Sequence, residues 1–248
     1  MNMKHASLVL ALSFAAGSAA AATTDFSSGA QGWTGMQPAN GVGGSGIDTS
    51  LGNGAPAYRT VLENFGISFT NKTNTDFVRD YTATSAVTFG IDVLAQEITY
   101  FGQNVTRDLV LELRDYDNAS NGLPYTSVWY TLGTLDASAS GWQHFSVTIG
   151  NTAGSALPAG WGGYGAEDAT GMPLLPADRT FASVLAGVDE IAFTTLKPGW
   201  AYGFTQFDVA IDNITVSAVP EPGETAMLMA GLGVLGAVAR RRRSRRSN

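Results

Sequence analysis

The amino-acid sequence predicts an all-β domain, a jelly-roll-like β-sandwich with one short helix, at residues 23–218. A signal peptide at residues 1–22 and a C-terminal membrane-spanning helix flank it. Three observations lead to this prediction. Apolar residues recur at every second position in many short runs, Gly, Asn and Asp separate these runs, and one segment alone has helical spacing. A domain of this length buries enough surface to fold without disulfides, and the chain has no cysteine.

Residues 1–22 have the three parts of a secretory signal peptide. Lys4 supplies the positive charge, residues 6–16 form the apolar segment, and Ala20, Ala21 and Ala22 fit the small-residue rule for cleavage. A buried N-terminal helix is the alternative, but the small residues at the end favour a signal. We therefore expect the mature chain to begin near Thr23, outside the cytoplasm.

Strands account for most of the domain. The alternation of apolar and polar residues is clearest in residues 87–93, 109–113 and 145–149. Further candidate strands are residues 66–70, 77–81, 126–132, 190–195 and 207–216. The only helical candidate is the segment 180–187, in which Thr180 is a suitable N-cap and Gly187 a suitable terminator.

The final strand contains an irregularity. Its apolar residues occupy odd positions up to Ile211 and even positions from Ile214 onward. A change of face within one strand requires an extra residue, so we expect a β-bulge at Asp212 and Asn213. A bulge redirects side chains, which would let Asp212 point toward a site at the edge of the sheet.

Two regions contain too much glycine for a strand prediction. Residues 29–54 and 150–171 are expected to form flexible loops. Four tryptophans directly follow a glycine, at positions 33, 142, 161 and 200, and their unequal spacing excludes a repeat.

The C-terminal residues 219–248 have the composition of a membrane-sorting tail. A short motif begins it, formed by Val219, Pro220, Glu221 and Pro222. We expect a helix at about residues 224–239, whose apolar stretch reaches only about 21 Å and makes a thin membrane span. A cluster of arginines follows at Arg240, Arg241, Arg242, Arg243, Arg245 and Arg246. Such a cluster stays cytoplasmic, which leaves the domain on the other side of the membrane.

This order of a Pro-Glu-Pro signature, a short apolar helix and terminal arginines resembles the PEP-CTERM sorting tail. The resemblance implies processing by exosortase, an integral-membrane enzyme of Gram-negative bacteria that make exopolysaccharide. An ordinary single-pass anchor with a positive stop-transfer block is the alternative. The implied route is an inner-membrane-anchored precursor that is delivered to the cell surface or released.

The domain itself resembles jelly-roll modules of extracellular proteins, including carbohydrate-binding modules and the laminin domain IV family. The matching residues are Asp25-Phe26 with Gly32-Trp33, the segment 109–115, the segments 181–185 and 191–193, and Ile211-Asp212-Asn213-Ile214. In many such modules the aspartate of the closing strand binds a structural calcium.

Charge excludes a role in nucleic-acid binding. Residues 23–219 hold 7 Lys and Arg against 19 Asp and Glu, so the domain repels phosphate backbones. The lack of cysteine also excludes thiolate metal sites and a cysteine nucleophile.

Catalysis is not expected. His144, the one histidine of the mature domain, faces outward on a predicted strand and has no nucleophile motif nearby. Glu167 and Asp168 form the best carboxylate pair for glycan hydrolysis, but adjacent acids in a polar loop are ordinarily solvated.

Calcium is the metal that the sequence favours, because hard cations take oxygen ligands. The loop from Asp115 to Asn118 superficially resembles a calcium loop, but a hairpin turn explains it better. The resemblance to jelly-roll modules instead implies a structural calcium at Asp212, together with Asp25. The alternative for Asp212 is an aspartate that accepts hydrogen bonds from backbone amides at the bulge.

Aromatic residues beside glycine suggest a sugar-binding surface, since rings stack on pyranose faces. Trp161 and Tyr164 are the pair expected to be most exposed, followed by Trp200. Trp129 and Tyr130 share a predicted strand, so at least one of them belongs to the core. Two functions follow. The first is a non-catalytic surface or matrix protein associated with exopolysaccharide, and the second is a glycan-binding or glycan-hydrolysing module.

Overall fold

The computed structural model describes residues 21–38, 42–54 and 56–218. Two antiparallel sheets dominate this part of the chain, together with one short α-helix and one 3-10 helix, η1 (Tyr81–Ala83). The sheets pack face to face as a β-sandwich. The prediction of an all-β, jelly-roll-like fold is therefore confirmed. The signal peptide lies almost wholly outside the described residues, and the sorting tail lies entirely outside them.

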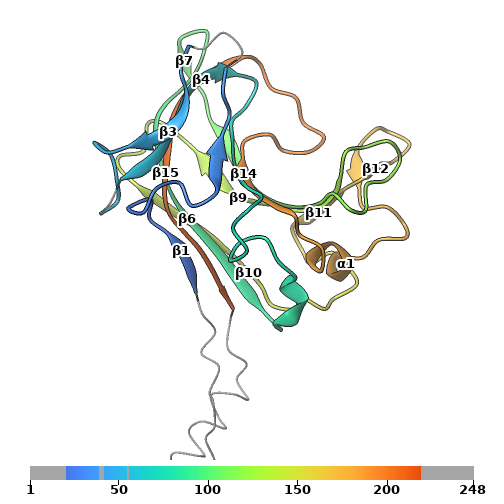
Figure 1. Cartoon of the computed structure of the whole chain (residues 1–248). Helices are drawn as coiled ribbons and strands as arrows, with labels where there is room; N and C mark the ends of the chain where they lie inside the picture. The colour runs from blue at the N-terminus through green and yellow to red at the C-terminus, as the bar shows by residue number, and fades with distance from the viewer. Residues whose placement is uncertain (1–20, 39–41, 55, 219–248) are drawn as a thin grey trace, which may run out of the picture. The chain divides into compact units, whose positions relative to one another are not determined.

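The first sheet contains the two longest strands. Its order is β10 (Gln143–Ile149), β6 (Val87–Tyr100), β15 (Thr205–Ala218), β4 (Ala57–Asn64) and β3 (Gly44–Asp48), with β1 (Ala22–Thr24) paired to β15 and β7 (Gln103–Asn104) paired to β6. Figure 1 shows β1 beside the end of β15, whereas β7 lies at the opposite end of the sandwich. We call this the seven-stranded sheet.

The second sheet has six strands. Their order is β11 (Trp161–Tyr164), β9 (Thr126–Leu135), β8 (Arg107–Asp115), β14 (Glu190–Thr194), β5 (Ser68–Asn71) and β2 (Trp33–Gly35). A separate ribbon pairs β12 (Ala166–Glu167) with β13 (Pro173–Leu174). It follows β11 directly along the chain (Figure 1).

The core lies between the two sheets. Side chains at alternate positions of both sheets fill it with less than about one-fiftieth of their surface exposed, including Phe89, Ile98, Leu111, Phe193 and Phe207. The alternation that the sequence displays is thus the alternation between core and outer face.

The predicted helix is present as α1 (Phe181–Leu185). Thr180 caps it, accepting a hydrogen bond from the backbone of Ser183, whose own side chain accepts one from the Thr180 backbone. This reciprocal capping box satisfies two amides that the first turn would otherwise leave without partners. The buried side chains of α1 pack into the core.

The predicted β-bulge is also confirmed. The register of β15 against β6 shifts between Asp212 and Thr215, and Asn213 adopts a left-handed backbone with φ of 47°. As a result, Ile211 and Ile214 both reach the core although they lie three positions apart. Asn is one of the few residues other than glycine that tolerate this conformation.

Two predictions about local structure were wrong. Residues 77–81 form a turn that leads into η1 rather than a strand, because Asp80 caps η1 through the amide of Thr82 at 2.8 Å. The glycine-rich regions also contain strands, namely β2 and β3 in the first and β11 and β12 in the second. The glycines interrupt the alternation of apolar and polar side chains, but the backbone still pairs with neighbouring strands.

Candidate functional site

The outer face of the six-stranded sheet carries a concentration of charged and aromatic side chains. Leu111 and Leu113 of β8 point into the core. Because side chains alternate along a strand, Glu112 and Arg114 point outward. Trp129 stands opposite Glu112 on the neighbouring strand β9. We define the outer strip as Lys72, Asp108, Glu112, Arg114, Tyr116, Tyr125, Trp129, Tyr164, Glu190, Lys197 and Trp200.

A buried ion cluster forms the base of the outer strip. Arg114 donates to Glu112 at 2.5 Å and to Glu190 at 2.7 Å, and both carboxylates are almost fully buried. The second oxygen of Glu112 accepts from the Ser127 hydroxyl at 2.6 Å. Burial alone would lower the pKa of Arg114, but the adjacent carboxylates raise it above its ordinary value. The guanidinium therefore stays charged and holds both acids in place.

The second oxygen of Glu190 is also occupied. It accepts from the Tyr116 hydroxyl and from Lys72 Nζ, each at 2.8 Å. Every carboxylate oxygen in the cluster thus has a donor, which is the condition under which buried charges are tolerated. Such a network fixes the positions of the side chains that surround it.

Tyrosine rings lie over this cluster. The Arg114 guanidinium stacks on Tyr125 with 4.8 Å to the ring centroid, and Lys72 stacks on Tyr116 at 4.6 Å. Tyr125 contacts Tyr116 at 5.2 Å and Tyr164 at 5.1 Å between centroids. Burial, followed by the charge of Glu112, raises the pKa of Tyr125, so its hydroxyl stays neutral. Tyr164, which the sequence singled out, is therefore part of a continuous row of rings.

Two tryptophans continue the outer strip. The Trp129 indole lies over Gly162 of β11 and is 3.4 Å from the Gly163 carbonyl through Nε1. Lys197, held by Asp108 at 3.0 Å, stands 5.7 Å from the Trp129 ring centroid and 5.1 Å from that of Trp200. Trp200 is 59% exposed. The expectation that Trp200 presents its ring to solvent is confirmed.

The expected exposure of Trp161 was wrong. Trp161 pairs with Tyr130 across β11 and β9, which turns both side chains toward the core. Its ring is 9% exposed and packs against Phe181 at 5.2 Å and Tyr130 at 5.4 Å. The neighbouring glycine at 162 makes room for Trp129 and does not open Trp161 to solvent. Residue parity in β9 therefore places Trp129, rather than Trp161, on the outer face.

The charges of the outer strip balance. Its three cations each contact a carboxylate of the strip, as Arg114 with Glu112, Lys72 with Glu190 and Lys197 with Asp108. A surface without an excess of either charge suits a neutral ligand that is bound through ring faces and hydroxyl groups.

The residues considered for catalysis are not brought together. Glu167 and Asp168 are exposed at the β12–β13 ribbon, and Asp168 accepts from Thr170 and from the Met172 amide, which lowers its pKa. His144 lies on β10 with its side chain 60% exposed and bonds Asp92 at 2.6 Å. It is a surface strand residue, as the sequence indicated.

Asp212 lies at the bulge and is fully buried. Its carboxylate accepts from the backbone amides of Asn53 and Asn213, both at 2.7 Å. Burial raises the pKa of Asp212, the two amides lower it, and the nearby carboxylates of Asp92 and Asp25 raise it further, with a net rise. This geometry is the amide-accepting arrangement that was the alternative to calcium.

The other residues of the predicted calcium sites are also engaged in hydrogen bonds. Asp25 accepts from Ser27 through the amide at 3.0 Å and the hydroxyl at 2.7 Å. Asp115 forms an ion pair with Arg179 and accepts from the Asn118 amide, in the loop that joins β8 to β9. Among residues 21–38, 42–54 and 56–218, no group of three or more acidic or histidine side chains is placed to hold a metal ion. The carboxylates present do not form a complete calcium shell, and calcium at Asp25 and Asp212 stays a prediction.

The C-terminal segment of the chain matches a known sorting motif. Residues 218–243 match the family model described as the PEP-CTERM protein-sorting motif. The motif marks an exported protein whose membrane-anchored precursor is sorted to the cell surface by exosortase. The resemblance of the tail to a PEP-CTERM sequence is thereby confirmed for residues 219–243.

Solved structures resemble the sandwich at low identity. The CBM22-2 xylan-binding domain of Paenibacillus barcinonensis Xyn10C is 11% identical with a TM-score of 0.44, covering 79% of this chain and 98% of that one. The family 30 carbohydrate-binding module of a Clostridium thermocellum cellulosomal cellulase is 15% identical with a TM-score of 0.41, covering 77% and 92%. The cellulose-induced protein Cip1 is 16% identical with a TM-score of 0.41, covering 80% and 97%. These likenesses concern the general architecture alone.

No curated protein matches the chain significantly. In the part of the chain that the structure describes, no helix has the length and hydrophobicity needed to cross a bilayer. The expected spanning helix at about 224–239 lies outside that part.

Proposed function

We propose that this exported protein is a non-catalytic surface or matrix protein that binds neutral polysaccharide along the outer strip. The observation that carries the proposal is the row of partly exposed rings held over a saturated, buried ion cluster. Aromatic rings stack on the apolar faces of sugars, and rings that are already fixed lose little entropy when they bind.

The dimensions of the outer strip fit a polysaccharide chain. The strip follows β8 from Asp108 to Arg114, which at about 3.4 Å per residue corresponds to about 20 Å. Tyr164 and Tyr125 lie beside the Arg114 end of this line. Trp129 is opposite Glu112, and Trp200 contacts Lys197, which is bound to Asp108 at the other end. A surface of this length contacts several consecutive sugar units.

Electrostatics favour a neutral polysaccharide over an acidic one. The cations of the outer strip are bound to its own carboxylates, and the domain as a whole carries many more acids than bases. A polyanion would therefore meet net repulsion at low ionic strength.

The alternative function, glycan hydrolysis, receives less support. The outer strip contains two carboxylates that lie close together, Glu112 and Glu190, and both are bound to Arg114. Both are almost fully buried and every one of their oxygens already accepts from a protein donor, so neither is open to the oxygen of a glycosidic bond.

Affinity electrophoresis through gels that contain neutral or acidic polysaccharide tests the proposal. Wild-type protein should be retarded by neutral polysaccharide, and Trp129→Ala should lose most of that retardation. His144→Ala, which removes an exposed ring from the outer face of the other sheet, is the control and should migrate like wild type. Equal retardation of Trp129→Ala and wild type would contradict the proposal.

A further inference from the structure

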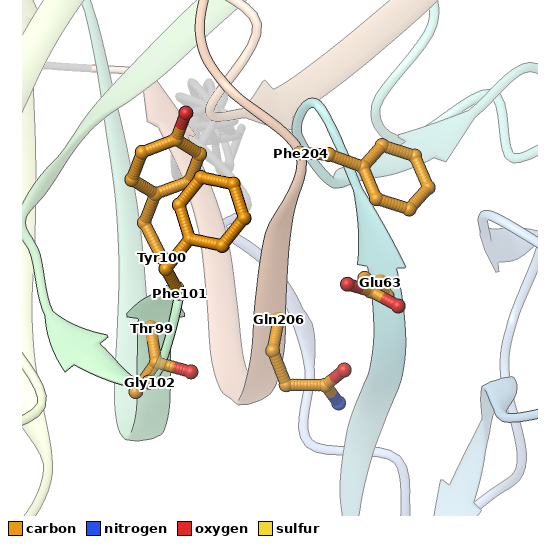
Figure 2. Close-up of a pocket in the computed structure, with 7 residues that line it drawn as sticks. All are labelled: Glu63, Thr99, Tyr100, Phe101, Gly102, Phe204 and Gln206. Carbon is orange, nitrogen blue, oxygen red and sulfur yellow. The ribbon is translucent and has the colours of Figure 1, made fainter.

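A pocket lies at one end of the seven-stranded sheet. The pocket there has a volume of about 280 Å³. Its lining includes Glu63, Thr99, Tyr100, Phe101, Phe204 and Gln206. Figure 2 shows the rings of Tyr100 and Phe101 on one side and that of Phe204 on the other, with Gln206 between the two sides and Glu63 below Phe204.

The floor of this pocket is a row of polar side chains. Gln206 of β15 pairs with Glu63 of β4 on one side and with Thr99 of β6 on the other. The next residue along β15, Phe207, points into the core, so these three side chains point outward together. Within the described part of the chain, neither the Glu63 carboxylate nor the Gln206 amide has a protein hydrogen bond or ion pair. The floor therefore offers free donors and acceptors.

The walls of the pocket are aromatic and unusually open. Phe101 is 88% exposed, Phe204 is 49% exposed and Tyr100 is 38% exposed. Tyr100 contacts Phe101 at 4.5 Å between centroids, and Phe65 contacts Phe204 at 5.2 Å. Large exposed rings grouped around a hollow are a feature of binding sites rather than of ordinary protein surface.

The backbone at Phe101 adds a second, independent observation. Tyr100 pairs with Gln103, so Phe101 and Gly102 form a two-residue hairpin loop with φ values of 49° and 72°. This is the type I′ turn, in which Asn or Asp ordinarily precedes Gly. A phenylalanine at positive φ is unfavourable, and here its ring gains almost no burial in return. The fold thus places an exposed ring at a position where folding alone favours a small polar residue.

We infer that this pocket binds one or two neutral sugar units, at a site separate from the outer strip. The polar row matches adjacent sugar hydroxyls, which both donate and accept, and the flanking rings match sugar faces. The volume lies just below the range for drug-sized ligands, which suits a monosaccharide or disaccharide. The Glu63 carboxylate, with Glu97 bonded to Thr99 at 3.0 Å, disfavours acidic sugars.

The pocket lies at the start of β15. Gln206 is the second residue of this strand, and Ala218 ends it. The twelve intervening steps correspond to about 40 Å of extended strand.

Calorimetric titration of the full chain in detergent tests this inference. The probes are neutral cello-, xylo- and manno-oligosaccharides, from monosaccharide to hexasaccharide. Phe101→Asn removes the ring and installs the residue that the turn prefers, so its melting temperature should not fall, while affinity for a disaccharide should fall about tenfold or more. Glu63→Gln, which keeps the size of the side chain, should also weaken disaccharide binding. His144→Ala, at a residue that belongs to neither the pocket nor the outer strip, should leave it unchanged.

The inference does not rest on the proposed function of the outer strip. Affinity at the pocket should stop rising at about the disaccharide, whereas affinity at the outer strip should continue to rise with chain length. Wild-type affinity in both Phe101→Asn and Glu63→Gln, or no disaccharide binding by the wild type, would overturn the pocket inference alone. It would also be overturned if Phe101→Asn lost binding to phosphatidylglycerol vesicles while its sugar binding stayed at the wild-type level.

Discussion

The indole ring of Trp129 lies directly over Gly162, the residue opposite it in the pairing of β9 with β11. A Cβ atom at position 162 would lie 2.2 Å from both Cε2 and Cζ2 of the indole. No real side chain tolerates such a contact, so the glycine is what allows the ring to lie flat against the strand. A backbone position in one strand thereby orients the central ring of the outer strip.

This contact predicts the effect of adding one methyl group. Gly162→Ala should displace the Trp129 ring and reduce affinity for neutral polysaccharide about tenfold, or about 1.4 kcal/mol. The overpacking should cost about 1–3 kcal/mol of stability. Gly46→Ala is the matched control, because nothing lies within 4 Å of a Cβ at that strand position. Unchanged binding by Gly162→Ala would mean that the indole orientation does not matter.

The buried ion cluster predicts a large stability effect at its centre. Arg114→Met removes the cation that contacts both Glu112 and Glu190, and it leaves two buried carboxylates without their guanidinium partner. We expect a loss of about 3–5 kcal/mol in the free energy of unfolding, measured by urea denaturation.

The matched control removes a surface cation that contacts one of the same carboxylates. Lys72 also contacts Glu190, but its side chain is 56% exposed. Lys72→Met should therefore cost no more than about 1 kcal/mol. If the two variants lost equal stability, burial would not be what distinguishes the two contacts.

The sequence was most informative where a strand has one face in the core and one in solvent. Alternation predicted β6, β8 and β10, and the change of parity within β15 predicted the bulge at Asp212. The capping residue Thr180 located α1 for a related reason, since the first turn of a helix must satisfy its own amides. In each of these cases the residues themselves carry the constraint.

The sequence was least informative where a glycine makes room for a side chain from another part of the chain. The segment Trp161–Tyr164 has the composition of a loop, but Gly162 is required by Trp129, 33 positions earlier in the chain. Only the strand pairing reveals that relationship. The same pairing decides that Trp161 faces the core, so its wrongly expected exposure and the unrecognised role of Trp129 have one cause.

The candidate site was predicted only in part. Tyr164 and Trp200 do lie in the outer strip, but the ion cluster beneath them was not foreseen. Glu112, Arg114 and Glu190 come from two strands that are distant in the sequence, and single charged residues on a strand indicate only a solvent-facing position. Alternation of large aliphatic residues with Glu and Arg in β8 is the one signal that was available.

Acid should destabilise the fold through Asp48. Hydrogen bonds from Ser50, followed by those from Arg59, lower the pKa of Asp48 from 3.8 to about 2. Because the folded pKa lies below the unfolded one, this stabilisation is fully present above about pH 4 and is lost as the pH falls toward about 2. Asp48→Asn should make the decline of melting temperature across this interval shallower. An identical decline in the variant would assign the acid sensitivity to other carboxylates.

Calcium should stabilise the protein if it binds at Asp212 and Asp25. A cation would offset the mutual repulsion that contributes to the raised pKa of Asp212. Calcium at 100 times its dissociation constant would add about 2.7 kcal/mol, so EDTA should lower the melting temperature by several degrees. Asp25→Asn should abolish the EDTA effect while leaving intact the two amides that Asp212 accepts. No shift with EDTA in the wild type would remove calcium from this site.

The sorting motif predicts a change at the C-terminus during export. From the sequence we expect the prolines at 220 and 222 to disfavour a helix, which suits access by a processing enzyme, and we expect the arginines from 240 onward to keep the precursor at the membrane. Mass spectrometry of the mature protein from its native host should find a chain that lacks the arginine cluster. Replacing Pro220 and Pro222 together by Ala should leave the uncleaved precursor in the membrane fraction, whereas Glu224→Gln, outside the Pro-Glu-Pro signature, should be processed normally. A mature protein that retains Arg240 to Arg246 would instead indicate an ordinary single-pass anchor, because a stop-transfer segment keeps its positive cluster while a sorting tail loses it.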